Sequence, residues 1–179
     1  LIEQKNQTFE RMEVTVPLEG HTGTSLRNIV NMLASKERLI MKSFQVEEAL
    51  VDDAFAEELS EKEITDTESF KKAFLEARPE RCPGLTFDFK EGLITFALEA
   101  EAFTPEQAKA WSDLVGCLNV YAKTLKHASF KPSPDENPKF TFRVWLTRMG
   151  LNGEGYKETR KTLLAPLEGN SAFRKPKKK

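Results

Sequence analysis

The stretch LTFDFKEGLITFAL, residues 85–98, decides the fold that this sequence predicts. Apolar and polar residues alternate over 85–89, which is typical of a strand with one buried face. A second apolar run covers 93–98, and Gly92 between the two runs supplies the positive φ that a short loop needs. The stretch therefore predicts an antiparallel hairpin on which a small sheet is built.

A third strand and a helix are predicted upstream of this hairpin. The residues of MEVTVPL at 12–18 alternate between apolar and polar and include β-branched side chains, which favours a half-buried strand. Pro17 has no N–H to donate, so this strand ends there or lies at an edge of the sheet. Apolar residues then recur at i, i+3, i+4 and i+7, which predicts a helix capped by Thr24 or Ser25 and ending near Lys36.

Three further helices are expected: one over 46–59, one that Thr67 caps and that ends before Pro79, and one over 105–127. The last of these begins with a capping box, because Gln107 follows Thr104 by three residues. The short apolar run at 39–44 fits a strand or a helix, since periodicity cannot decide at this length.

The C-terminal stretch FTFRVWLTRMGLNGEGYKETRKTLLAPLEGNSAFR, residues 140–174, predicts a helical hairpin. Its first segment, 140–151, fits both a strand and a helix. We favour the helix, because Trp145 and Met149 would otherwise lie on the polar face of a strand. A second helix is expected over 154–164, beyond a Gly-rich break.

Within this hairpin, Gly150 is expected to end the first helix in a left-handed conformation. Pro166 should stop the second helix, and Phe173 should dock on the core. The sequence as a whole thus predicts an α+β fold, with a small antiparallel sheet packed against several helices and a C-terminal helical hairpin.

The predicted organisation is a single domain over 12–174, preceded by a flexible lead at 1–11 and followed by a basic tail at 175–179. Met12 is a candidate native start, because the first predicted strand begins there. A weak internal echo relates 12–44 to 93–130, in each of which a strand precedes a capped helix, and it suggests a strand–helix unit used twice.

Basic charge is concentrated at the C-terminal end. Residues 139–179 carry eleven Lys or Arg against three Glu, whereas the whole chain has a net charge of −1. In helix-turn-helix proteins the second helix enters the major groove, and its basic residues contact phosphates and base edges. We therefore predict DNA or RNA binding through Lys157, Arg160, Lys161 and Arg174.

Two alternatives stay open for this charge pattern. A helical hairpin that only packs on the sheet has the same pattern, with its basic side facing water. A continuous basic patch that includes Arg143 and Arg148 would favour the nucleic-acid interpretation. The other alternative is a protein-interaction module that uses the acidic run at 47–68 or the hairpin itself.

No catalytic, metal-binding or cofactor-binding motif is found in the sequence. Cys82 and Cys117 lack CxxC or Cys/His metal spacing, so we expect reduced thiols in a cytoplasmic protein. No run of about 20 apolar residues predicts a membrane span. An enzyme would instead require a pocket that gathers polar groups such as His21, Asn28 and Asn31.

Two stretches carry a resemblance to a known family. MEVTVPLEGHTGTSLRNIVNML at 12–33 and FRVWLTRMGLNGEGYKETRKTLLAPLEGNSAFR at 142–174 resemble a family of small proteins from Gram-positive gut bacteria. These proteins are usually labelled "virulence-related" and travel with conjugative or other mobile elements. The resemblance implies a cytoplasmic, non-enzymatic accessory protein of a mobile element, and it assigns no catalytic residue and no cofactor.

Overall fold

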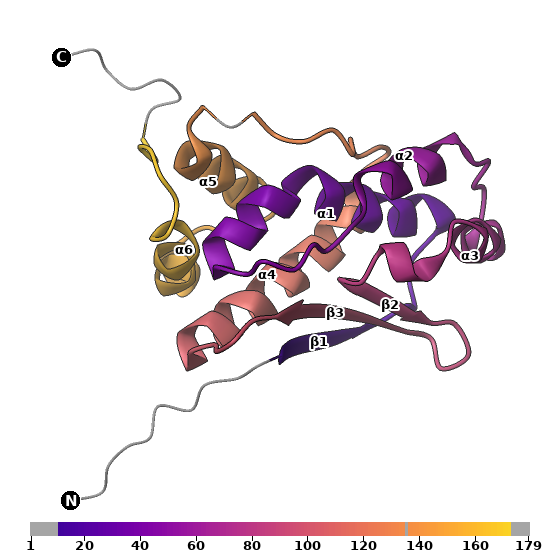
Figure 1. The fold of residues 1–179 in the computed structure, drawn as a ribbon, viewed down its shortest axis with the longest axis horizontal. Helices are drawn as coiled ribbons and strands as arrows, with labels where there is room; N and C mark the ends of the chain where they lie inside the picture. Colours follow the sequence, from indigo (N-terminus) through magenta and orange to yellow (C-terminus); the bar gives the residue numbers. More distant parts are fainter. Residues whose placement is uncertain (1–10, 135, 173–179) are drawn as a thin grey trace, which may run out of the picture.

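The structure is a computed structural model, and it describes residues 11–134 and 136–172. Its sheet has three antiparallel strands in the order β1-β3-β2: β1 (Arg11–Pro17), β2 (Leu85–Asp88) and β3 (Leu93–Glu99). β2 and β3 form the predicted hairpin, with Asp88 opposite Leu93 and with Gly92 at φ +69° in the loop. The predicted fold class is confirmed: the chain is α+β (Figure 1).

The connections around the sheet form a split β-α-β arrangement. β1 and β2 both run antiparallel to β3, so they run parallel to each other with β3 between them. The crossover from β1 to β2 contains three α-helices and a short 3₁₀ turn: α1 (Gly23–Phe44), α2 (Asp53–Glu61), α3 (Thr67–Glu76) and η1 (Pro79–Arg81).

After β3 the chain continues as α4 (Pro105–Thr124), α5 (Pro138–Arg148), the 3₁₀ turn η2 (Glu154–Tyr156) and α6 (Lys157–Leu164). The helices lie over one face of the sheet, and no described element covers the other face (Figure 1). Alternation along the strands produces this difference, because Ile94 and Phe96 point into the core while Thr15 and Thr86 are exposed.

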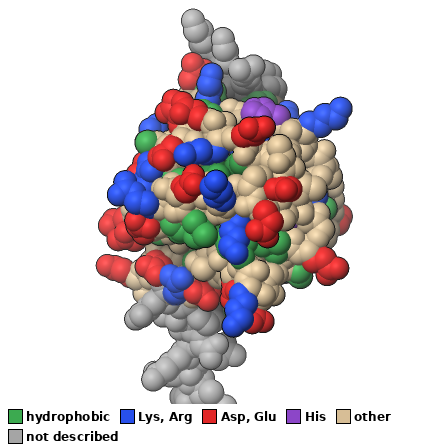
Figure 2. All heavy atoms as spheres, turned by 90° about the vertical axis from the view of Figure 1, so that its right-hand side faces the viewer, with side chains coloured by type: hydrophobic (Ala, Val, Ile, Leu, Met, Phe, Trp, Pro, Cys, Tyr) green, Lys and Arg blue, Asp and Glu red, His purple; other side chains and the backbone are tan. Residues whose placement is uncertain are grey.

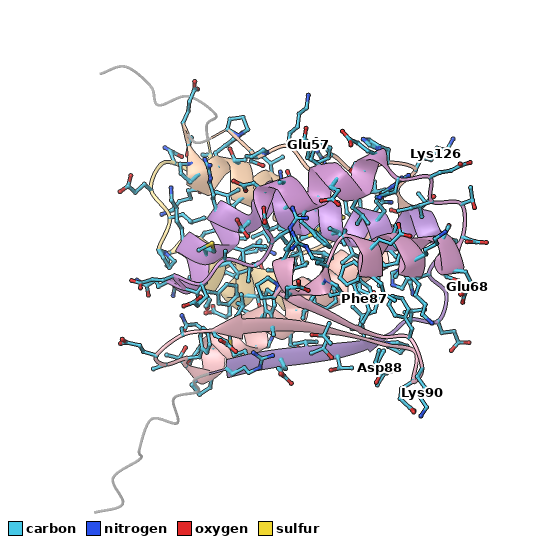
Figure 3. All side chains as sticks on the ribbon, turned by 45° about the vertical axis from the view of Figure 1, so that its right-hand side comes forward. Glu57, Glu68, Phe87, Asp88, Lys90 and Lys126 are labelled. Carbon is cyan, nitrogen blue, oxygen red and sulfur yellow. The ribbon has the colours of Figure 1, made fainter. Side chains whose placement is uncertain are left out.

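The core is centred on α1, which packs against α2, α3, α4 and α6. Near its end, the rings of Phe44 and of Trp111 on α4 pack in a T-shaped arrangement, with their centroids 5.6 Å apart. At the other end of the molecule Phe55, Phe74 and Phe87 join α2, α3 and β2, with ring centroids 4.8–5.4 Å apart. Figure 3 shows Phe87 between the sheet and the helices, whereas Asp88 and Lys90 lie at the tip of the hairpin.

Helix α1 is longer than predicted and begins earlier. Its cap is Thr22, not Thr24 or Ser25; Ser25 is the third helical residue and completes a capping box with Thr22. The helix also continues beyond Lys36 to Phe44, so the ambiguous run 39–44 is helical. The polar residues at 36–38 interrupt the apolar period, which resumes at Leu39; Arg38 is exposed, whereas Lys36 and Glu37 are half-buried and bond to other elements.

The helix predicted over 46–59 is shorter than expected and begins at Asp53, with Asp52 as its cap. Leu50 and Val51 donate their backbone N–H groups to the carboxylate of Glu37 at 2.8 and 2.6 Å. Gly84 N donates to Leu50 O at 2.9 Å. These bonds to distant residues hold 46–52 as a loop, and they override a helical pattern that is only local.

Smaller differences concern the other helices. α3 is capped by Asp66 instead of Thr67, and α4 ends at Thr124 instead of near 127. Thr104 and Gln107 form the predicted capping box at the start of α4. Phe173, predicted to dock on the core, lies outside the described residues, and the internal echo between 12–44 and 93–130 stays a prediction.

Candidate nucleic-acid interface

The first helix of the predicted hairpin, α5, begins at Pro138, where the Oδ1 atom of Asn137 accepts the N–H of Phe140 at 3.2 Å. Proline suits the first helical position because the N–H it lacks would have no partner there. Phe142, Trp145 and Leu146 are buried on one side of α5. The segment 140–151 is therefore helical over most of its length, as its pattern predicted.

The second helix, α6, is fixed to the core by buried hydrogen bonds. Ser43 on α1 donates to the carbonyl of Leu163 at 2.6 Å. Thr159, which is 3% exposed, donates its hydroxyl to Asp113 on α4 at 2.6 Å. Because these contacts hold the inner side of α6, its orientation and the direction of its outer side are set by the fold.

The connection between α5 and α6 is longer than that of a helix-turn-helix motif. It comprises residues 149–156, whereas the turn in such motifs has about three or four residues. Gly150 adopts φ +100°, as predicted, and Leu151 N donates to Leu146 O at 2.9 Å. The C-terminal part is thus a helical hairpin with an ordered loop that is longer than the turn of the DNA-binding motif.

The predicted contact residues Lys157 and Lys161 are both exposed on α6. They are four residues apart and therefore lie on the same side of the helix. The Nζ atom of Lys157 lies 3.9 Å from Glu154, a pair in which both side chains are largely in solvent. Among the described residues Lys161 has no ion-pair partner.

Arg160, also predicted as a contact residue, lies in a different environment. It is half-buried, and its Nη1 atom donates to Leu151 O at 3.2 Å and to Gly153 O at 2.9 Å. The guanidinium therefore holds the loop between α5 and α6. Arg174, the fourth predicted residue, lies outside the described residues.

Helix α5 carries further cations beside the four predicted contact residues. Arg143 and Arg148 are exposed on this helix, and Lys139 is half-buried in its first turn. Over 138–172 the chain has six Lys or Arg against three Glu, a net charge of +3. Arg143 and Arg148, which the basic patch considered from the sequence would include, are five residues apart and flank the buried face of α5 on opposite sides.

The acidic run lies at the other end of the molecule, on α2 and α3 and their flanking loops (Figure 1). Residues 46–81 carry twelve Asp or Glu against five Lys or Arg, a net charge of −7. Figure 2 faces this end and shows Asp and Glu side chains over much of it, with Lys and Arg among them.

Several of these acidic groups have structural partners. Arg81 lies 3.2 Å from Asp52 and 2.6 Å from Glu58, and Asp66 accepts the N–H of Ser69 at 2.8 Å. The hydrogen bond from Arg81 lowers the pKa of Glu58, and the backbone N–H of Ser69 lowers that of Asp66.

The polar residues of the enzyme hypothesis are buried and make hydrogen bonds that hold the fold together. Asn28 donates to the carbonyls of Ala122 and Leu125 at 3.1 and 2.9 Å, and Asn31 donates to Ala128 O at 2.9 Å. These bonds satisfy the carbonyls at the end of α4.

His21 is likewise held inside the protein, between Ser25 and Asn119. Its Nε2 atom faces Asn119 Oδ1 at 2.6 Å and its Nδ1 atom faces Ser25 Oγ at 2.9 Å. Burial lowers the pKa of His21, with the charge of Lys123 adding to the effect. The ring is therefore a neutral link between α1 and α4.

The two cysteines are unpaired in the structure. Burial raises the pKa of Cys82 to about 12, so this thiol is not a nucleophile at neutral pH. Burial also raises the pKa of Cys117, which lies near Tyr156. Within the described residues, no group of three or more His, Cys, Asp or Glu side chains is placed to hold a metal ion.

An open groove of about 610 Å³ lies between the end of α1, the start of α5 and the residues that follow α6. Met41, Val46, Pro138 and Pro166 give it apolar walls, and charged residues stand at its rim. Among the described helices, none combines the length and apolar character that crossing a membrane requires.

In comparisons with known proteins, no family model, no curated protein and no solved structure matches this chain.

Proposed function

We propose that this chain is a non-enzymatic accessory protein of a mobile element that binds nucleic acid through its α5–α6 end. One observation carries the proposal: over 138–172, the stretch that contains α5 and α6, Lys and Arg outnumber Glu six to three, at the end of the molecule opposite the acidic α2–α3 end. Polyanions are attracted to one end of such a charge distribution and repelled from the other.

The placement of the individual side chains supports this orientation. Lys157 and Lys161 extend from the outer side of α6, whose inner side is fixed by Thr159 and Leu163. Arg143 and Arg148 add exposed cations from α5. Arg160 takes the role of a loop anchor, so in this proposal it positions the interface and does not itself supply the main phosphate contact. The resemblance of 12–33 and 142–174 to mobile-element proteins supports the accessory role.

The test is a titration of a fluorescent duplex and a single-stranded oligonucleotide with the full chain at several salt concentrations. Each phosphate contact that a lysine makes steepens the salt dependence of the binding constant by about 0.9 in logarithmic units. We expect Lys157→Gln with Lys161→Gln to reduce that slope by about two. The matched control is Lys71→Gln with Lys72→Gln, which removes two lysines from α3 and should leave the slope unchanged. Binding that is absent, or insensitive to salt, would contradict the proposal.

A second candidate function is a protein-interaction module, and the side chain of Leu75 favours it. This residue is 51% exposed on α3, one of the two helices that carry the acidic run, with Lys71 and Lys72 one turn before it. An apolar side chain within a charged surface is typical of an interface for another protein, in which the charges set orientation. A basic partner would bind the wild type more tightly than Leu75→Ser, with no change in nucleic-acid affinity.

A further inference from the structure

Three elements meet beside the exposed end of α5. Lys36 extends from the middle of α1 and lies over the ring of Trp145 on α5, with its Nζ atom 5.8 Å from the ring centroid. The same Nζ atom donates to Ser133 Oγ at 2.5 Å. One ammonium group is thus placed against a helix and a loop that are distant from it in sequence.

The loop that supplies Ser133 is held in a defined position. Pro132 and Pro134 flank this serine, and each proline restricts φ to a narrow range. The backbone N–H of Ser133 donates to the carbonyl of Ser35 on α1 at 3.1 Å. The hydroxyl is therefore fixed beside Lys36, and because it accepts from Lys36 its own proton remains available to donate.

Among the described residues, no carboxylate pairs with the positive charge in this region. Lys36 is half-buried, and burial together with the charge of Arg148 lowers the pKa of its ammonium group. In the part of the chain that the structure describes, no carboxylate lies within ion-pair distance of Lys36 or of Arg148. Lys36 is thus a partly desolvated cation over Trp145, and Arg148, one turn beyond Trp145 on α5, adds a second positive charge nearby. An anion bound at these groups would offset both charges.

We propose that Lys36, Ser133 and Arg148 form a binding site for a phosphate group at the junction of α1, α5 and the loop around Ser133. A tetrahedral oxyanion can accept hydrogen bonds from the ammonium, the hydroxyl and the guanidinium together, and a guanidinium can bind two of its oxygens at once. The site extends the basic end of the molecule from α5 onto α1. If the bound phosphate belongs to a nucleic acid, this inference rests on the proposed function; if it is a free phosphate ion, the inference is independent of that function.

The test uses inorganic phosphate with the isotope-labelled full chain, followed by NMR at constant ionic strength with chloride as the reference anion. We expect saturable shifts of the Trp145 indole N–H and of the amides of Ser133 and Arg148. Arg148→Gln and Ser133→Ala should each weaken phosphate binding at least about tenfold. Both replace exposed or half-buried side chains and leave the core unchanged, so folded variants are expected.

A matched control exists at the other end of the molecule. The Nζ atom of Lys71 lies over the ring of Phe89 at 5.6 Å, the same arrangement as Lys36 over Trp145. Lys71→Met should leave phosphate binding unchanged, whereas Lys36→Met, which keeps the apolar stem over the ring, should abolish it.

The outcomes separate this proposal from the proposed function. Shifts that do not saturate, that chloride reproduces, or that persist in Arg148→Gln would overturn the phosphate site. If phosphate binds but duplex and single-stranded oligonucleotides do not, the site stands and the proposed function fails. If oligonucleotides bind and Arg148→Gln weakens them together with inorganic phosphate, the site is part of the nucleic-acid path.

Discussion

The two ends of this molecule use charge differently. At the α2–α3 end, several charged residues serve the fold: Arg81 bridges Asp52 and Glu58, Lys62 lies 3.7 Å from Glu76, and Asp66 caps a helix. At the α5–α6 end, among the described residues, the one ion pair within the hairpin is the exposed Lys157–Glu154 contact.

This difference shows why net charge alone is a poor guide to function. The acidic end carries the larger excess, −7 against +3, yet several of its carboxylates already have partners. The basic end carries a smaller excess, and four of its six cations, Arg143, Arg148, Lys157 and Lys161, are exposed. Both ends therefore keep charge that no described side chain pairs, and of the two only the basic end attracts a polyanion.

The largest expected effect comes from adding one methyl group at each end. At Gly23 a Cβ would collide with the backbone carbonyl of Asp66, where α1 meets the start of α3, whereas at Gly150 nothing lies within 4 Å. We expect Gly23→Ala to destabilise the fold by about 3 kcal/mol. Gly150→Ala should cost roughly 1–2 kcal/mol, because alanine disfavours the positive φ there. Equal losses in urea unfolding would show that the two ends are packed alike.

Acid should loosen the acidic end first. The pKa values of Asp52, Glu58 and Asp66 are lowered in the folded state by hydrogen bonds from Ala54 N–H, Arg81 and Ser69 N–H, respectively. Their stabilising effect is present above the unfolded values of about 4 and is lost as pH falls through the lower folded values. Amides of α2 and α3 should therefore lose hydrogen-exchange protection before those of α5 and α6. Earlier loss in α5 and α6 would contradict the assignment of structural charge to the acidic end.

Arg160 tests whether the basic end contains structural cations as well. Because it donates to Leu151 O and Gly153 O, Arg160→Met should destabilise the fold by about 1 kcal/mol. The salt dependence of oligonucleotide binding should change less than in Lys161→Gln. A variant of unchanged stability whose slope falls by about one would instead make Arg160 a phosphate contact.

The smallest expected effect on stability is that of Glu154→Gln. Its pair with Lys157 is largely in solvent, so the free energy of unfolding should change by less than about 0.5 kcal/mol. Removing this negative charge beside Lys157 should nevertheless strengthen oligonucleotide binding at low salt. Weaker binding in this variant would mean that the outer side of α6 does not face the ligand.

The local parts of the fold could be predicted from the sequence. The hairpin at 85–98, the Thr104 capping box and the left-handed Gly150 each depend on a few neighbouring residues. The loop at 46–52 could not be predicted from its own residues. The N–H groups of Leu50 and Val51 donate to Glu37, and the carbonyl of Leu50 accepts the N–H of Gly84. Such distant partners leave no trace in a local pattern.

The positions of the candidate interface residues could be predicted to the same extent. Spacing alone places Lys157 and Lys161 on one side of a helix, and the structure has them exposed on α6. The role of Arg160 depends on backbone carbonyls in the preceding loop, which no side-chain pattern reveals. The neighbourhood of Lys36, Ser133 and Arg148 joins residues from three separate parts of the chain, so it becomes visible only in the fold.

The most direct test of the central claim is to map where an oligonucleotide contacts the labelled full chain by NMR. We predict that amide and side-chain signals of α5 and α6 shift as duplex or single-stranded oligonucleotide is added, while those of α2 and α3 stay unchanged. Shifts centred on α2 and α3, or no shifts at low salt, would contradict the claim that the unpaired charge of the basic end is the functional charge.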